Sequence, residues 1–171
     1  MPSKLSEAES RVLESIQGAA FDVPGVLPTA RGLSHWGEHA LGWVGTAAVG
    51  AGVDKRRREG WIRVGAAAFL AHAASVVLKR IVRRKRPDYS YVRVGVKTPS
   101  KLSFPSSHAT STTAFLVAVA RLTGRKAPLF GVPVMMASRM VLGVHYPTDT
   151  AVGAAIGAAT AEVVMKGMKH E

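Results

Sequence analysis

The residues of this chain that could do chemistry fall in three short segments, and the first contains the sequence KRIVRRKRP, residues 79–87. Lys79 and Arg86 are seven positions apart, about two turns of an α-helix, so both side chains could point to one side before Pro87 ends the helix. An ammonium group and a planar guanidinium together suit the oxygens of a phosphate dianion. Taken alone, such a basic run at a helix end is more often an anchor for lipid headgroups.

The second segment, FPSSH at residues 104–108, opens directly into an apolar stretch. Serines after a proline at a helix start expose free backbone N–H groups, which bind phosphate together with the helix dipole. The alternative is that Ser106 or Ser107 only caps the helix. His108 lies in the first turn, where an imidazole beside a bound phosphate could act as general acid for a leaving alkoxide.

The third segment runs from Ser138 to Asp149. Arg139 lies inside an apolar stretch, where an unpaired guanidinium is costly, so we expect it to face a partner or a polar cavity. His145 and Asp149 are four apart; on a helix, the carboxylate could hold one imidazole nitrogen and leave the other free to attack. The alternatives are that Asp149 caps a helix or that the two residues belong to a metal site.

The elements that must position these residues are apolar. Hydrophobic residues make up 47% of the 171-residue chain, and the charges fall in blocks between five apolar stretches. Each stretch is near the lower end of the roughly 17–25 residues that span a bilayer as a helix. The sequence therefore predicts an all-α, integral-membrane bundle of about five transmembrane helices, with a soluble five-helix bundle as the alternative. The stretches are residues 36–53, 61–78, 108–122, 127–143 and 150–165.

The N-terminal region is more polar than the rest of the chain. Residues 6–20 repeat apolar side chains near the helical period, which predicts an amphipathic helix on the membrane or against the bundle. Residues 21–33 hold two prolines and two glycines and are expected to form a loop. We expect a single membrane-embedded domain over residues 1–171, with the amphipathic helix and loop in 1–35 and the bundle with its catalytic loops in 36–171.

Charge and composition limit the partners. The net charge of +12 favours anionic partners, and the long apolar stretches favour membrane lipids and phosphorylated lipids over nucleic acid. The chain has no cysteine, which excludes a zinc–thiolate site and a cysteine-nucleophile phosphatase. Five crossings would place the 79–107 loop and the 144–149 turn on the same membrane face. Lys and Arg number 13 on that face and 10 on the other, so the positive-inside rule does not choose an orientation.

In order and spacing, the three segments resemble the signature of the type 2 phosphatidic acid phosphatase superfamily: Lys79 with six residues to Arg86-Pro87, then Pro105 to His108, then Ser138-Arg139 with His145 and Asp149. The resemblance implies a helical membrane enzyme that hydrolyses lipid phosphates without a metal or cofactor. It departs at Ser107, where the family more often has glycine, and in the count of helices, which is usually six. Vanadate-dependent haloperoxidases share a similar anion pocket and are a rival, as is a non-catalytic basic membrane scaffold.

The resemblance also implies a role for each matching residue. His145 would attack phosphorus, Asp149 would orient His145, and His108 would protonate the leaving oxygen and later activate water. The phosphate oxygens would be bound by the remaining five residues, which are Lys79, Arg86, Ser106, Ser107 and Arg139.

Two further segments, 32–43 and 98–115, resemble a narrower branch of the family, the decaprenylphosphoryl-phosphoribose phosphatases of cell-wall arabinan synthesis. This implies a polyprenyl-linked sugar phosphate as substrate, with phosphatidic acid or a polyprenyl pyrophosphate as the alternatives. Family habit favours the plasma membrane and an extracytoplasmic site. Of the polar residues outside the signature, His35, Glu38 and His39 could border the substrate entrance, whereas His72 is expected to be a packing residue. The second, diester phosphate could bind a basic group made of Arg80, Arg83, Arg84, Lys85 and Arg93.

Overall fold

The computed structural model describes residues 4–166, and within them the regular structure is helical. The prediction of an all-α fold is therefore confirmed. Short 3-10 turns at Glu38–Ala40, Lys55–Arg57 and Ala127–Phe130 join some of the helices. The α-helices are α1 (Lys4–Ala20), α2 (Val26–Trp36), α3 (Leu41–Val53), α4 (Arg58–Val82), α5 (Ser107–Thr123), α6 (Gly131–Val141) and α7 (Pro147–Met165).

Three of the five predicted apolar helices, those at 61–78, 108–122 and 150–165, agree with α4, α5 and α7 to within a few residues. The stretch at 36–53 is interrupted, because His39 and Ala40 have positive φ values of 52° and 60° and α3 begins only at Leu41. The stretch at 127–143 contains a 3-10 turn before α6 begins at Gly131. Both differences shorten a predicted span.

The predicted loop at residues 21–33 is wrong, because most of it belongs to helix α2. Gly25 precedes this helix with a φ of 85°, which glycine adopts without steric cost. Pro28 lies in the first turn, where its missing N–H has no intrahelical acceptor to lose. The residues that signalled a loop thus mark where a helix begins.

The centre of the bundle is α5, which packs against α4, α6 and α7. Its contact with α7 is close because α7 presents glycine there. A Cβ atom on Gly157 would lie 2.2 Å from the carbonyl oxygen of Thr110, and one on Gly153 would lie 2.8 Å from that of Ser106. The two glycines, four positions apart, allow the close helix contact expected from their spacing. The same contact brings the start of α7 against the start of α5.

Large apolar side chains also cover the outside of the bundle. One segment of the described chain, Lys55–Val82, is long and apolar enough to cross a membrane by length and composition alone, and Ala127–Val141 is a shorter apolar helical segment. The number of spanning helices therefore stays a prediction. The exposed large apolar side chains of α3, α4, α6 and α7 are Leu41, Val49, Val53, Ile62, Phe69, Leu70, Val77, Ile81, Val82, Val134, Val152 and Val163.

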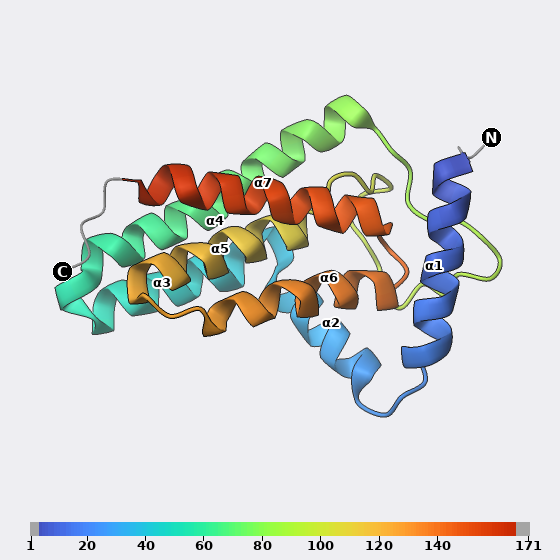
Figure 1. Ribbon diagram of the computed structural model, residues 1–171, viewed down its shortest axis with the longest axis horizontal. Coiled ribbons are helices and arrows are strands. Elements are labelled where there is room, and N and C mark those ends of the chain that lie inside the picture. The colour runs from blue at the N-terminus through green and yellow to red at the C-terminus, as the bar shows by residue number, and fades with distance from the viewer. Residues whose placement is uncertain (1–3, 167–171) are drawn as a thin grey trace.

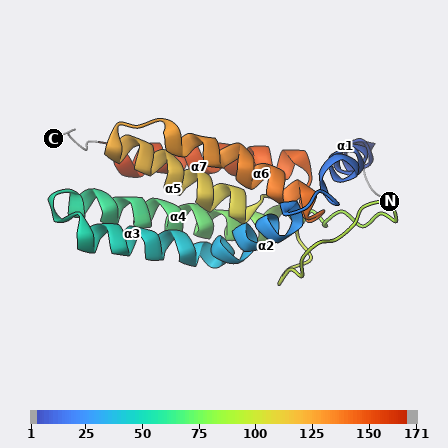
Figure 2. The same cartoon turned by 90° about the horizontal axis from the view of Figure 1, so that it is seen from below.

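Helix α1 lies across one end of the bundle, beside the loop that joins α4 to α5 (Figures 1 and 2). Two of its apolar residues, Leu5 and Val12, are exposed, and its buried face is mainly polar. The residues of that face are Ser6, Glu9, Ser10, Leu13 and Gln17. Helix α1 is thus packed against the protein, one of its two expected placements, by its polar side.

Substituting Gly157 with alanine should destabilise the protein, because the new methyl group would push α7 away from the backbone of α5. We expect a loss of about 1–3 kcal/mol, typical of overpacking a core, measured by thermal unfolding in detergent. Gly45→Ala is the matched control, since a Cβ atom there meets nothing within 4 Å; it should be neutral or slightly stabilising. Equal stability of the two variants would contradict this account of the α5–α7 contact.

Candidate active site

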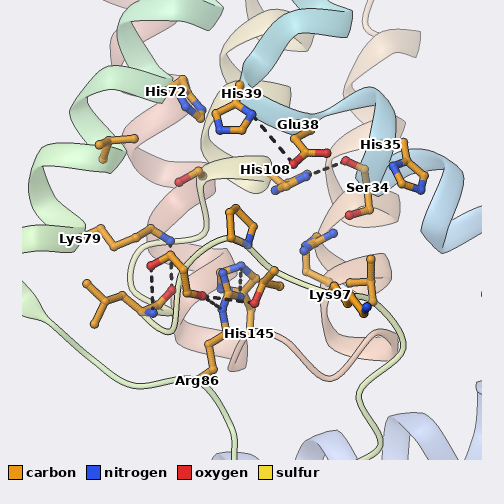
Figure 3. A pocket seen from close by; sticks show the side chains of 18 of the residues that line it. Ser34, His35, Glu38, His39, His72, Lys79, Arg86, Lys97, His108 and His145 are labelled. Atoms are coloured by element: carbon orange, nitrogen blue, oxygen red, sulfur yellow. Dashed lines mark hydrogen bonds and ion pairs between the residues drawn. The ribbon is translucent and has the colours of Figure 1, made fainter.

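The three segments singled out in the sequence meet at one end of the bundle. The backbone N–H of Ser106 donates to the carbonyl oxygen of Asp149 at 3.0 Å, and Nη1 of Arg86 donates to that of Val144 at 2.6 Å. A cavity of about 320 Å³, lined by residues of all three segments, opens at this end of the bundle (Figure 3). Six of the eight predicted site residues line it, namely Lys79, Arg86, Ser107, His108, Arg139 and His145.

Lys79 and Arg86 both face the cavity, but not from one helix as the spacing suggested. Helix α4 ends at Val82, and Arg83 has a φ of 56°, so the chain turns back before Arg86. Backbone carbonyls then hold the two cations. Nε of Arg86 donates to Ser100 at 2.8 Å, and Nζ of Lys79 lies 3.4 Å from the oxygen of Leu102. Burial lowers the pKa of Arg86 to about 10, so it stays charged near neutral pH.

Arg139 is the most informative cation of the site. Its side chain is 1% exposed, and no described residue accepts a hydrogen bond from its Nε or Nη1. An unpaired buried guanidinium is costly unless an anion completes its hydrogen bonds. Since it lines the cavity beside Lys79 and Arg86, Arg139 does face a polar cavity as expected, and the three cations form a site suited to a phosphoryl group.

His145 and Asp149 meet at the start of α7 and not along a helical face. The helix begins at Pro147, so His145 precedes it. Asp149 is fully buried; its Oδ2 accepts from the backbone N–H of Tyr146 at 2.9 Å and lies 3.6 Å from Nδ1 of His145. The N-cap of α7 is Tyr146, so Asp149 is not the cap itself; from the third helical position it holds the backbone of that cap and also faces the imidazole.

The surroundings of His145 favour the neutral form of its imidazole. Burial, and then the nearby charges of Arg86, Arg139 and Lys79, lower its pKa well below the usual value of 6.5. Its Nε2 lies 3.1 Å from Nη1 of Arg86, at the cation group (Figure 3). Because a guanidinium can only donate, Nε2 is the nitrogen without a hydrogen, and its lone pair, which accepts from Arg86 here, is the one that can attack phosphorus.

His108 and the two serines occupy the start of α5. Nε2 of His108 lies 2.9 Å from the carbonyl oxygen of Ser34 in α2, and because a carbonyl can only accept, Nε2 carries the hydrogen. Ser107 lines the cavity. Ser106 lies outside the lining and is fully buried, and its Oγ accepts from the N–H of Ala109 at 3.4 Å. The hydroxyl of Ser106 thus acts as the helix cap.

The cavity extends beyond the cations to a rim of polar side chains. Ser34, His35, Glu38 and His39 lie there, on the side of the cavity formed by α2 and the turn after it (Figure 3), which fits the expected substrate entrance. His72 also lines the cavity, with its ring 5.9 Å from that of His39. Helix α4 thus turns His72 toward the site, and the expectation that it is a packing residue stays a prediction.

The basic group expected to hold a second phosphate is largely dispersed. Of its five members only Arg80 lines the cavity. Arg93 pairs with the carboxylate of Asp22 at 2.9 Å, and Arg84 points to Asp149 and to Glu9 of α1. Lys97 lines the cavity, and nothing in the sequence singled it out, because the path of its long loop has no periodic pattern.

A metal site at His145 and Asp149, the remaining alternative, lacks the ligands for it in the described part of the chain. Residues 4–166 contain no group of three or more His, Asp or Glu side chains placed to hold a metal ion. The donors that converge on the cavity are mainly cationic or imidazole nitrogens, a set that suits an anion better than a cation.

Comparison with known proteins agrees with this chemistry. Decaprenylphosphoryl-5-phosphoribose phosphatase of Mycobacterium tuberculosis is 51% identical over 96% of this chain and 93% of its own length. The protein of the same name from Mycolicibacterium smegmatis is 56% identical over 88% of this chain and 84% of its own length. A solved structure, the transmembrane PAP2 type phosphatidylglycerolphosphate phosphatase from Bacillus subtilis, has the same fold, with a TM-score of 0.68, 22% identity and coverage of 92% of this chain and 84% of that one.

The family assignment follows from these matches. The model of the PAP2 superfamily matches residues 60–171, which include all three segments of the site. The Mycobacterium tuberculosis relative extends the similarity to α1 and α2, since its alignment covers nearly the whole chain. This chain belongs to the PAP2 superfamily of phosphatases.

Proposed function

We propose that this protein hydrolyses the phosphomonoester of a polyprenyl-linked phosphoribose through a phosphohistidine intermediate on His145. The observation that carries the proposal is the cation group, the buried Arg139 with the half-buried Lys79 and Arg86, placed around a neutral imidazole in one cavity. Such a group binds a dianionic phosphoryl group and leaves one nucleophile beside it. The names of the two relatives support the substrate class.

The cations act mainly on the transition state. As phosphorus is transferred, negative charge spreads over its three equatorial oxygens, and preorganised donors stabilise that charge without reorganisation. Arg139 offers two unpaired donors, Arg86 is fixed by the carbonyls of Ser100 and Val144, and Ser107 contributes from the start of α5. Carbonyl anchors keep Arg86 in place before substrate arrives.

In the first step Nε2 of His145 attacks phosphorus, and the bond from phosphorus to the ribose oxygen breaks. The leaving oxygen takes a proton from His108, which enters this step as the imidazolium, its second proton favoured by the negative charge of the bound phosphate. Because Nε2 of His108 faces the carbonyl of Ser34, its Nδ1 is the nitrogen that carries the transferred proton. The carboxylate of Asp149, on the Nδ1 side of His145, orients the ring and stabilises the positive charge that develops on it.

In the second step water attacks the phosphohistidine. His108, now neutral, takes a proton from that water, the phosphorus–nitrogen bond breaks, and inorganic phosphate leaves with His145 neutral again. The same imidazole thus acts first as acid and then as base. Each proton and each bond is accounted for by side chains of this chain and water, with no metal or other cofactor in either step.

The rest of the cavity suits the rest of such a substrate. Arg80 and Lys97 at the rim can pair with the diester phosphate that links the ribose to the lipid. Glu38, His35 and His39 offer the carboxylate and imidazole groups that hydrogen-bond sugar hydroxyls. Phosphatidic acid and polyprenyl pyrophosphates lack the ribose and would leave these groups unused.

We also propose that the bundle lies in the plasma membrane with its site at the extracytoplasmic face. Large apolar side chains exposed around α3, α4, α6 and α7 support burial in lipid, and Lys55–Val82 is long enough to cross it. Membrane extraction that requires detergent, followed by protease access to the loop at 83–106 from the outside of intact cells, tests both parts.

The central prediction concerns His145 and metal independence. Purified wild-type protein in detergent should release phosphate from a polyprenyl phosphoribose in the presence of EDTA, and His145→Ala should lower kcat about a thousandfold or more. Acid-labile, alkali-stable labelling of the wild type with a ³²P substrate would identify the phosphohistidine. Full activity of His145→Ala would exclude the mechanism, and a preference for phosphatidic acid or a polyprenyl pyrophosphate would change the substrate.

Arg139 should matter most for anion binding. Replacing its planar fork by an ammonium group in Arg139→Lys removes at least one charged hydrogen bond, worth about 1.5–3 kcal/mol. We expect the inhibition constant of orthovanadate to rise about tenfold or more. Arg121→Lys is the matched control, because Arg121 pairs with Glu162 on the exposed surface. Equal inhibition constants in the two variants would show that Arg139 does not bind the anion.

The rim cations should affect substrates that carry a second phosphate. Lys97→Gln and Arg80→Gln are expected to raise KM for the polyprenyl phosphoribose several-fold, about 1 kcal/mol for an exposed charge pair, and to leave KM for ribose 5-phosphate unchanged. Lys85→Gln removes a charge from the same loop outside the cavity and serves as control. The same change in KM for both substrates would argue against a diester subsite at the rim.

A further inference from the structure

Arg84 forms a charged link behind the site that the reaction scheme above does not use. Its Nη1 donates to Oδ1 of Asp149 at 2.9 Å and to Oγ1 of Thr148 at 2.8 Å. The guanidinium also stacks over the ring of Tyr146 at 3.9 Å. The side chain of Arg84 is 17% exposed and that of Asp149 is fully buried, so this ion pair is largely shielded from water.

The two carboxylate oxygens of Asp149 have different partners. Oδ1 is held by Arg84, whereas Oδ2 accepts from the N–H of Tyr146 and faces Nδ1 of His145. Two fixed partners on different oxygens set the rotation of the carboxylate. Without Arg84, that rotation would be free to change, and a buried carboxylate would lose its nearest cation.

The other side of Arg84 belongs to α1. Nη2 donates to Oε2 of Glu9 at 2.6 Å and to Oγ of Ser6 at 3.0 Å, and Oε1 of Glu9 accepts from the backbone N–H of Thr148 at 2.8 Å. Although burial opposes it, the hydrogen bonds from Arg84 and Thr148 keep the pKa of Glu9 below its ordinary value. The charged carboxylate of Glu9 thus binds both Arg84 and the first turn of α7.

The position of Glu9 is itself fixed by a second contact of α1. Gln17 is 2% exposed; its Nε2 donates to the carbonyl oxygens of Arg93 and Val141, and its Oε1 accepts from the N–H of Arg93. Both donors of the amide nitrogen and one acceptor site of its oxygen are therefore directed at the two segments that lead into the site. These hydrogen bonds hold helix α1 about two turns away from Glu9 and oppose its movement along its own axis.

From these contacts we propose that Arg84 is a positioning residue for Asp149 and His145, and that Glu9 of α1 holds Arg84 in place. Helix α1 then contributes to the geometry of the active site, in addition to any contact it makes with the membrane. The proposal rests on the function proposed above, because the positioned groups are those that carry the phosphohistidine chemistry.

The experiment is a double-mutant cycle on phosphate release, with Arg84→Gln made in the wild type and in Asp149→Asn. If Arg84 acts through Asp149, Arg84→Gln should lower kcat about tenfold or more in the wild type, with KM changed less than about threefold, and should have less than about twofold effect in the Asp149→Asn background. A merely structural role of Arg84 would lower kcat by the same factor in both backgrounds and would overturn the proposal.

Glu9→Gln tests the α1 part and keeps the proposal testable if Arg84→Gln fails to fold. The amide keeps the shape and can still accept from Thr148, so the fold should survive, yet kcat should fall about threefold or more with KM unchanged. Arg84→Lys, which keeps the charge, should recover part of the rate lost in Arg84→Gln.

Two controls complete the design. Glu7→Gln, on the exposed side of α1, and Lys85→Gln, beside Arg84 but exposed, should both keep the wild-type kcat. An unchanged kcat in Glu9→Gln, or a fall of equal size in Glu7→Gln, would overturn the role of Glu9. Wild-type protein inactive on every lipid phosphate would instead count against the proposed function, so the two failures are distinguishable.

Discussion

Three cationic side chains share one cavity at the end of a bundle built from small apolar residues, and this concentration of like charge constrains the rest of the site. Arg139 is almost fully buried without acceptors for two of its donors, a state that is stable only if the surrounding structure holds it. The carbonyls of Ser100, Leu102 and Val144 partly offset the charge of its two neighbours. In the proposed mechanism, a phosphoryl group that enters the cavity offsets this energetic cost, which is how preorganised electrostatic stabilisation works.

The same charges explain why one histidine can act as nucleophile. A cationic environment and burial keep His145 neutral, and a carboxylate on the far side of its ring can stabilise the positive charge that forms as it attacks. That carboxylate must remain charged although it is fully buried, so it needs a cation of its own that does not compete for substrate. Arg84 meets this need from behind the site. The cations therefore divide into a group that lines the cavity and one, Arg84, that faces Asp149.

Close helix packing is what brings these groups into register. Gly153 and Gly157 let α7 approach the backbone of α5, and the starts of both helices then meet, so that Ser106 hydrogen-bonds to Asp149. Helix α1 closes the same end with its polar face, an arrangement opposite to that of an amphipathic helix held by its apolar side. The polar character of this face is explained by what it contacts, because Arg84 presents a charge to Glu9 and the backbone of Arg93 and Val141 hydrogen-bonds to Gln17.

The sequence by itself determined the helical class, the positions of α4, α5 and α7, and the eight residues of the signature, because apolar periodicity and motif spacing are local properties of the chain. It did not determine α2, whose proline and glycine mark a helix start as readily as a loop, or the path of residues 83–106, which has no repeating pattern. Only the tertiary structure decided that Arg84 faces Asp149 and that Lys97 reaches the cavity. Those contacts join residues far apart in sequence, and their partners become known only once the helices have packed.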